Sequence, residues 1–116
     1  MNNPENLLPL TPAVFHILLA LADEEGHGYG IMREILTHSD GQLKMGPGTL
    51  YGTIKRMIAS QLIEESGERP APELDDERRR YYRITSFGRA VARAEARRLA
   101  QLVKLARESG FVPGRA

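Results

Sequence analysis

The side chains best suited to contact another molecule lie on one face of a helix that we predict from Pro47 to about Ser60. Its apolar positions recur with helical spacing and leave the opposite face to small, hydroxyl, aromatic and basic residues. Hydroxyl and basic side chains donate hydrogen bonds to phosphates and base edges, and small residues allow close approach. This face carries Gly48, Thr49, Gly52, Lys55, Arg56 and Ala59, with Tyr51 and Thr53 on its flanks.

No acidic residue occurs from Lys44 to Ile63, so this helix presents only positive charge to a partner. A short helix and a turn precede it, which is how a helix-turn-helix places its second helix in the major groove of DNA. An ordinary amphipathic helix with a solvated basic face would show the same pattern. For this helix alone, both interpretations stay open.

A second basic cluster lies at the return of a predicted hairpin. Arg78, Arg79 and Arg80 follow directly after the acidic run 73–77. Three consecutive arginines favour contact with phosphates or with a minor groove. The alternative is that the neighbouring acidic residues neutralise them within a loop.

Catalytic and metal-binding patterns are missing from the sequence. His16, His27 and His38 are spaced by 11 residues, which fits no metal-binding motif. There is no cysteine, so disulfides and thiol chemistry are excluded. Neither a nucleophile-elbow motif nor a phosphate-binding glycine motif occurs. The sequence therefore predicts no enzyme, no catalytic residue, no cofactor and no metal.

Three helices are expected before the hairpin. Thr11 as N-cap and Pro12 at the first helical position predict the start of a mostly apolar helix. Gly28 opens a second, short helix, and a polar connection over residues 38–48 leads to the third.

Two short strands are expected next, at residues 62–65 and 81–85, flanking a polar loop over 66–80. The order helix, helix, helix, hairpin, helix predicts a mainly α fold with a small β-hairpin, in the α+β class. It corresponds to a winged helix-turn-helix with a long C-terminal helix. We divide the chain into an N-terminal arm (1–10), a DNA-binding domain (11–84), a C-terminal dimerisation helix (85–109) and a tail (110–116).

The last helix carries a wide apolar stripe that a small domain cannot bury alone, which predicts a homodimer. The expected dimer contacts are Phe87, Val91, Ala94, Glu95, Arg98, Leu99, Leu102 and Leu105. Glu95 and Arg98 project from within this stripe, so we expect them to pair across the two subunits. The alternative is a helix that folds back on its own domain.

Charge is distributed unevenly along the 116 residues, although the net charge is only +1. Residues 1–77 hold five Lys/Arg and 13 Asp/Glu, a net −8, whereas residues 78–116 hold 11 and two, a net +9. This asymmetry favours a polyanionic partner or charge pairing between subunits. No apolar run has the length of a membrane span and no signal peptide opens the chain, so a cytoplasmic protein without membrane contact is expected.

Three stretches resemble the PadR family of bacterial winged-helix transcription regulators. They are HGYGIMREI (27–35), GPGTLYGTIKRMIASQLIEE (46–65) and RRRYYRITSFGRA (78–90). The single C-terminal helix is similar to that of the short-tailed members. The resemblance implies a homodimer that binds a pseudo-palindromic operator in double-stranded DNA through the third helix and the wing, and dimerises through the last helix.

Carried over by position, the resemblance implies DNA contacts at Thr49, Tyr51, Lys55 and Arg56, supported by Tyr29 and the wing arginines. It also implies repression that a small molecule commonly releases. An effector pocket lined by Phe15, Phe87 and Val91 is conceivable, but core packing is the better interpretation of these residues. The competing hypothesis is a winged-helix module whose basic surface serves a protein partner instead of specific DNA.

Two positions depart from the family pattern. Gly52 stands where proline is frequent, and Gln61 stands where glycine is usual. Gln61 would have to adopt the helix-ending conformation that glycine reaches easily.

Overall fold

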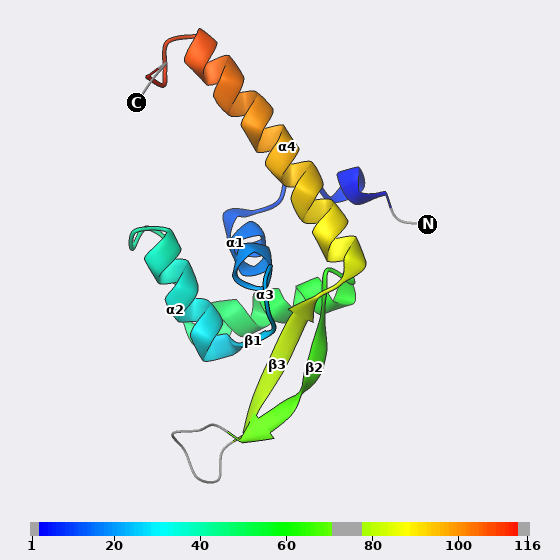
Figure 1. The fold of residues 1–116 in the computed structure, drawn as a ribbon. Helices are drawn as coiled ribbons and strands as arrows, with labels where there is room; N and C mark the ends of the chain where they lie inside the picture. Colours follow the sequence, from blue (N-terminus) through cyan, green and yellow to red (C-terminus); the bar gives the residue numbers. More distant parts are fainter. Residues whose placement is uncertain (1–2, 71–77, 114–116) are drawn as a thin grey trace.

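A computed structural model describes residues 3–70 and 78–113 of the chain (Figure 1). Its elements follow the predicted order, with one additional short strand and a short 3₁₀ helix in the arm. The bounds are η1 Pro4–Leu7, α1 Pro12–Ala20, β1 Gly26–His27, α2 Gly28–His38, α3 Pro47–Ala59, β2 Ile63–Pro70, β3 Arg78–Ile84 and α4 Ser86–Glu108. The predicted mainly helical winged-helix fold is confirmed.

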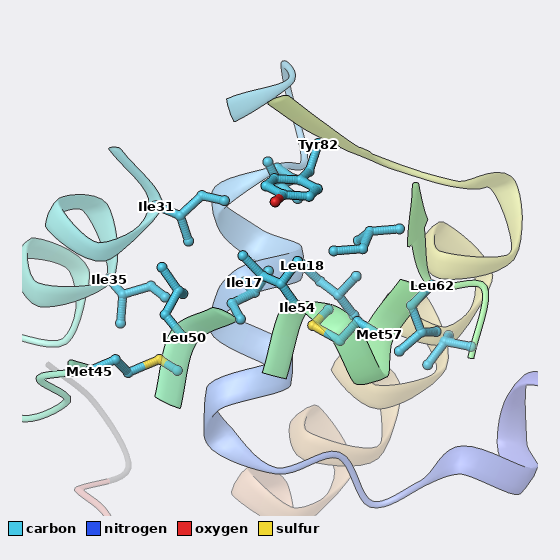
Figure 2. Close-up of a cluster of buried hydrophobic side chains, with 13 residues drawn as sticks. Ile17, Leu18, Ile31, Ile35, Met45, Leu50, Ile54, Met57, Leu62 and Tyr82 are labelled. Atoms are coloured by element: carbon cyan, nitrogen blue, oxygen red, sulfur yellow. The ribbon is translucent and has the colours of Figure 1, made fainter. Parts of the chain in front are cut away.

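α1 lies at the centre of the core. Thr11 caps it, its Oγ1 accepting a hydrogen bond of 3.2 Å from the Val14 amide, and Pro12 occupies the first turn as predicted. Ile17 and Leu18 of α1 are almost completely buried among side chains from α2, α3 and the sheet (Figure 2). The cluster also includes Ile31, Ile35, Met45, Leu50, Ile54, Met57, Leu62 and Tyr82.

The sheet has three strands in the order β1-β3-β2, all antiparallel. The predicted hairpin is present, but its strands continue to Pro70 and start again at Arg78, where the sequence favoured a loop. A polar composition gives no strand signal, whereas cross-strand hydrogen bonds and ion pairs stabilise this ladder. The two-residue strand β1 was not predicted, because a Gly-His pair has no strand pattern of its own.

The turn between α3 and β2 determines where α4 starts. The Leu62 amide donates to the Met57 carbonyl and the Gln61 amide to the Ile58 carbonyl, which is a Schellman motif with Gln61 at the left-handed position. Gln61 has φ = 65°, so the expected helix-ending conformation is confirmed.

α4 approaches this turn very closely at Gly88. A Cβ atom on Gly88 would lie 2.0 Å from the Leu62 carbonyl oxygen, so only glycine fits there. Thr85 caps α4, its Oγ1 accepting from the Gly88 amide at 2.8 Å and donating to the Gln61 carbonyl at 2.6 Å. The helix is therefore tied to the turn at its first residues.

α4 divides into a packed half and a projecting half (Figure 1). Val91, Ala94 and Glu95 are buried against their own domain. Beyond them the helix extends away from it, and Leu102, Val103 and Leu105 are 48%, 42% and 47% exposed. Among the described residues, no helix combines the length and apolarity needed to cross a bilayer.

Glu95 and Arg98, which we expected to pair across the two subunits, pair with each other within one chain. Both Glu95 carboxylate oxygens accept hydrogen bonds from Arg98 of the same chain, from Nε at 2.5 Å and from Nη2 at 3.1 Å. Two residues three positions apart on a helix are neighbours, so the pair forms locally without a partner subunit. The buried positions Val91, Ala94 and Glu95 likewise offer no surface for dimer contacts.

Candidate nucleic-acid interface

The exposed side of α3 is the surface that the sequence predicted for contact. We call it the free face of α3: Gly48, Thr49, Tyr51, Lys55 and Arg56, all of which are exposed. Leu50, Ile54 and Met57 lie on the opposite side and are at most 2% exposed. The burial of one side fixes the rotation of the helix, and the basic side chains point outward as a consequence.

Thr53 was predicted on the flank of this face, but it is only 2% exposed and cannot contact DNA directly. Its Oγ1 donates to the Thr49 carbonyl at 2.8 Å and accepts from Nη2 of Arg56 at 3.2 Å. The Arg56 guanidinium also lies over Gly52, whose added Cβ would meet Nη1 at 3.6 Å. Thr53 therefore orients Arg56, which lies three positions further along the same helix.

Tyr51 connects α3 to the start of α2. A Cβ on Gly28 would lie 2.2 Å from the Tyr51 hydroxyl oxygen, so the ring rests on the backbone of Gly28 and is 48% exposed. Beneath it, burial raises the pKa of the Tyr82 hydroxyl, and the neighbouring Tyr51 and Glu65 add to this effect. Tyr51 thus fixes the two helices of the helix-turn-helix relative to each other, which sequence analysis missed.

The N-terminus of α2 carries Tyr29, which is 53% exposed. The Arg33 guanidinium carbon lies 5.1 Å from the centre of its ring, in a cation–π arrangement. His27 caps the helix through Nδ1, which accepts from the Gly30 amide at 3.2 Å. An aromatic ring and a cation are thus presented together at this corner of the domain.

The wing arginines engage groups within the chain. Nε of Arg80 lies 3.9 Å from Glu65 and 3.8 Å from Glu68, and Nη1 of Arg79 lies 3.1 Å from Nε2 of His27. The side chain of Arg78 and the acidic run 73–77 fall outside the described residues. Acidic residues of β2 therefore face Arg80.

These wing ion pairs are exposed and separated by almost 4 Å, a geometry that contributes little to stability. A phosphate could replace either carboxylate at small cost. The wing therefore offers positive charge that a phosphate can bind, while the free face of α3 contains no acidic residue.

No group of three or more metal-ligating side chains occurs within residues 3–70 and 78–113. Among the residues considered for an effector pocket, Val91 is completely buried and Phe87 packs against the core. Phe87 also lines a small hollow of about 160 Å³ with Leu7 and Ser60. These observations favour core packing for Phe87 and Val91.

The exposed end of α4 is a second candidate interface. Of the eight residues predicted for dimerisation, Leu102 and Leu105 are exposed and Leu99 is half-buried. Val103, which was not in that set, adds to the same exposed apolar surface. The exposed stripe is therefore shorter and more distal than the sequence suggested.

A family model and a curated relative both point to transcriptional regulators. Residues 17–94 match the model of the family described as transcriptional regulator PadR-like. The chain is 37% identical over 89 residues to Transcriptional regulator Rv3488 of Mycobacterium tuberculosis, covering 77% of each protein.

Solved structures share the fold at lower identity. A PadR family transcription regulator from Clostridium difficile aligns with a TM-score of 0.69 at 20% identity, over 84% of this chain and 97% of that one. A PadR-like transcriptional regulator from Bacillus cereus aligns with a TM-score of 0.67 at 22% identity, over 90% and 91% of the two chains.

Proposed function

The chain belongs to the PadR-like family of transcriptional regulators, and we propose that it binds double-stranded DNA sequence-specifically as a homodimer on a pseudo-palindromic operator. We further propose that it acts as a repressor in the cytoplasm. Release by a small-molecule effector stays a prediction of the resemblance. The observation that supports DNA binding most strongly is the free face of α3, exposed, basic and opposite a completely buried face.

In the proposed complex, α3 enters the major groove. Thr49, Lys55 and Arg56 contact base edges or phosphates, and Thr53 holds the Arg56 guanidinium in place. Tyr51 keeps α3 seated on α2 while its exposed edge meets the DNA. The DNA phosphate backbone on either side is contacted by Tyr29, Gly48 and the wing residues Arg78, Arg79 and Arg80.

The distal half of α4 supplies the proposed dimer contact. Leu102, Val103 and Leu105 would otherwise expose an apolar surface on a projecting helix, and burial against a second copy removes it from water. A two-fold dimer presents two recognition helices, which fits an operator with two half-sites about 34–36 Å apart.

The test is fluorescence anisotropy with DNA from upstream of the chain's own gene and with scrambled DNA, across a salt series. Specific binding is expected to exceed non-specific binding by about 10³-fold or more and to weaken steeply with salt. Lys55→Ala and Arg56→Ala should each weaken binding about tenfold, on the order of 1–3 kcal/mol for a base contact. Arg89→Ala removes an exposed cation from α4 and serves as the matched control.

Unchanged affinity in both single variants and in the double variant would overturn the assignment of α3. Equal weak binding to both DNAs would mean that the operator lies elsewhere. No binding at low salt would favour the competing hypothesis, a winged-helix module that binds a protein.

A further inference from the structure

The carboxylate of Glu95 is the most deeply buried charge of the described chain, and the proposed DNA contacts do not use it. Its side chain is 2% exposed, and the residue is the last buried position along α4. Beyond it the helix leaves the domain (Figure 1). Glu95 therefore stands at the point where the packed half of α4 meets its projecting half.

This carboxylate joins two segments of the chain, the arm and α4. Oε2 accepts from the backbone amide of Leu10 at 2.9 Å, 85 positions away in the sequence. The same group accepts two hydrogen bonds from Arg98, whose side chain is 34% exposed. η1 of the arm also packs against α4, so the arm and α4 meet in this region.

A buried charge is retained only where it is paired and hydrogen-bonded, because an unpaired one costs several kcal/mol. Here the Arg98 hydrogen bonds lower the pKa of Glu95 most, burial opposes them, and the Leu10 amide lowers it further. The group is thus charged, and Arg98 of the same helix fixes its orientation. The Leu10 bond ties it to the arm, which restricts the direction in which α4 leaves the domain.

The part of α4 beyond Glu95 is long enough for a small change in its angle to move its end by about one base-pair rise. From Glu95 to Glu108 the helix extends about 20 Å at 1.5 Å per residue. A tilt of about 10° at Glu95 would move the end of the helix by about 3 Å, close to the 3.4 Å rise of one base pair. In a two-fold dimer joined through these ends, both subunits contribute the same displacement.

We propose that Glu95 is a positioning residue that fixes the angle between the winged-helix domain and the distal half of α4, and thereby determines which half-site spacing the dimer accepts. The spacing part of this inference rests on the proposed function. Leu10 and Glu95 both lie outside residues 17–94, the segment that the family model matches. The inference therefore rests on the contacts of Glu95 in this chain and not on the family model.

The angle can be measured within one chain, without DNA and without a dimer. The sequence contains no cysteine, so Ala59→Cys and Lys104→Cys, both at exposed positions, give unique spin-label sites on α3 and distal α4. Labelled protein is diluted into excess unlabelled protein, and electron–electron double resonance gives the intrachain distance distribution. Glu95→Gln, which keeps the shape but removes the charge, should shift or widen it by about 2 Å, because a tilt of about 10° acts over only about 14 Å between Glu95 and Lys104.

Two further variants make the result decisive. Glu108→Gln removes the same charge from the exposed end of the same helix and should leave the distribution unchanged. Arg98→Gln removes the guanidinium that pairs with Glu95. Its distance distribution tests the proposal if Glu95→Gln does not fold. A wild-type distribution in the folded Glu95 or Arg98 variant, even with lower stability, would show a merely structural role and overturn the proposal.

Operator spacing gives the second readout. Wild-type protein should prefer one spacing over spacings changed by one base pair in either direction, and Glu95→Gln should reduce this preference about tenfold while the protein stays dimeric. A retained preference would overturn the link to spacing. If wild-type protein binds no DNA, the proposed function fails, whereas the distance measurement still decides the role of Glu95.

Discussion

For the substitution Gly88→Ala, helix propensity predicts a more stable protein, whereas the tertiary contacts of Gly88 predict a less stable one. Gly88 lies in the first turn of α4, and helix propensity alone favours alanine there by about 1 kcal/mol. In the structure, the new Cβ would lie 2.0 Å from the Leu62 carbonyl oxygen and 2.9 Å from Cγ1 of Ile84. Backbone cannot move aside as a flexible side chain can, so α4 or the α3–β2 turn must shift by more than an ångström.

The cost follows from what that shift disrupts. Overpacking costs about 1–3 kcal/mol. The Thr85 amide donates to the Leu62 carbonyl at 3.1 Å, and weakening such a bond costs about 0.5–1.5 kcal/mol. After subtracting the propensity gain of about 1 kcal/mol, we expect Gly88→Ala to lower the free energy of unfolding by about 2 kcal/mol.

Urea unfolding followed by far-ultraviolet circular dichroism measures this quantity, since the chain has no tryptophan. The midpoint should fall by about 1 M or more at a slope of 1–3 kcal/mol/M, with protomer concentration held constant. Gly48→Ala is the matched control, because it lies in the first turn of α3 and its Cβ would meet nothing within 4 Å. That control should be neutral or stabilised. A Gly88→Ala protein as stable as wild type would refute the close approach of α4 to Leu62.

Three further predictions use the same structure. Gln61→Gly should raise the free energy of unfolding by about 0.5–1 kcal/mol in urea titrations, because glycine adopts φ = 65° without steric cost. Leu102→Glu should shift sedimentation from dimer to monomer, whereas Gln101→Glu, also exposed, should not. The pKa of Glu95 is lowered in the folded chain, so its contribution to stability is present above the ordinary carboxyl pKa of about 4.3 and is lost as the pH falls through the lowered value. Urea titrations from pH 7 to pH 3 should therefore show the advantage of wild type over Glu95→Gln shrinking only below about pH 4; an advantage independent of pH would contradict a charged Glu95.

Helix positions could be predicted because their signals are local. Thr11, Gly28, Pro47 and Thr85 mark the four starts through capping and backbone preferences that act within one turn. Apolar spacing then determined which side of α3 would be buried. Lys55 and Arg56 lie between the apolar positions of this helical repeat and are therefore exposed.

The pairings between distant residues could not be predicted in this way. β1 joins the sheet only because β3 provides its hydrogen-bond partners. Arginines of the wing were visible in the sequence, but the register of β2 against β3 decides that Glu65 and Glu68 face Arg80.

Glu95 shows the difference most clearly. Its place in an apolar stripe was evident from the sequence and suggested a partner in another subunit, whereas the structure pairs it with Arg98 and with the Leu10 amide. Sequence by itself determined the period, the caps and the charge of each segment, because these depend on neighbours within a turn. Only the tertiary structure decided which segments meet, because contacts across 85 positions depend on how all the elements pack together.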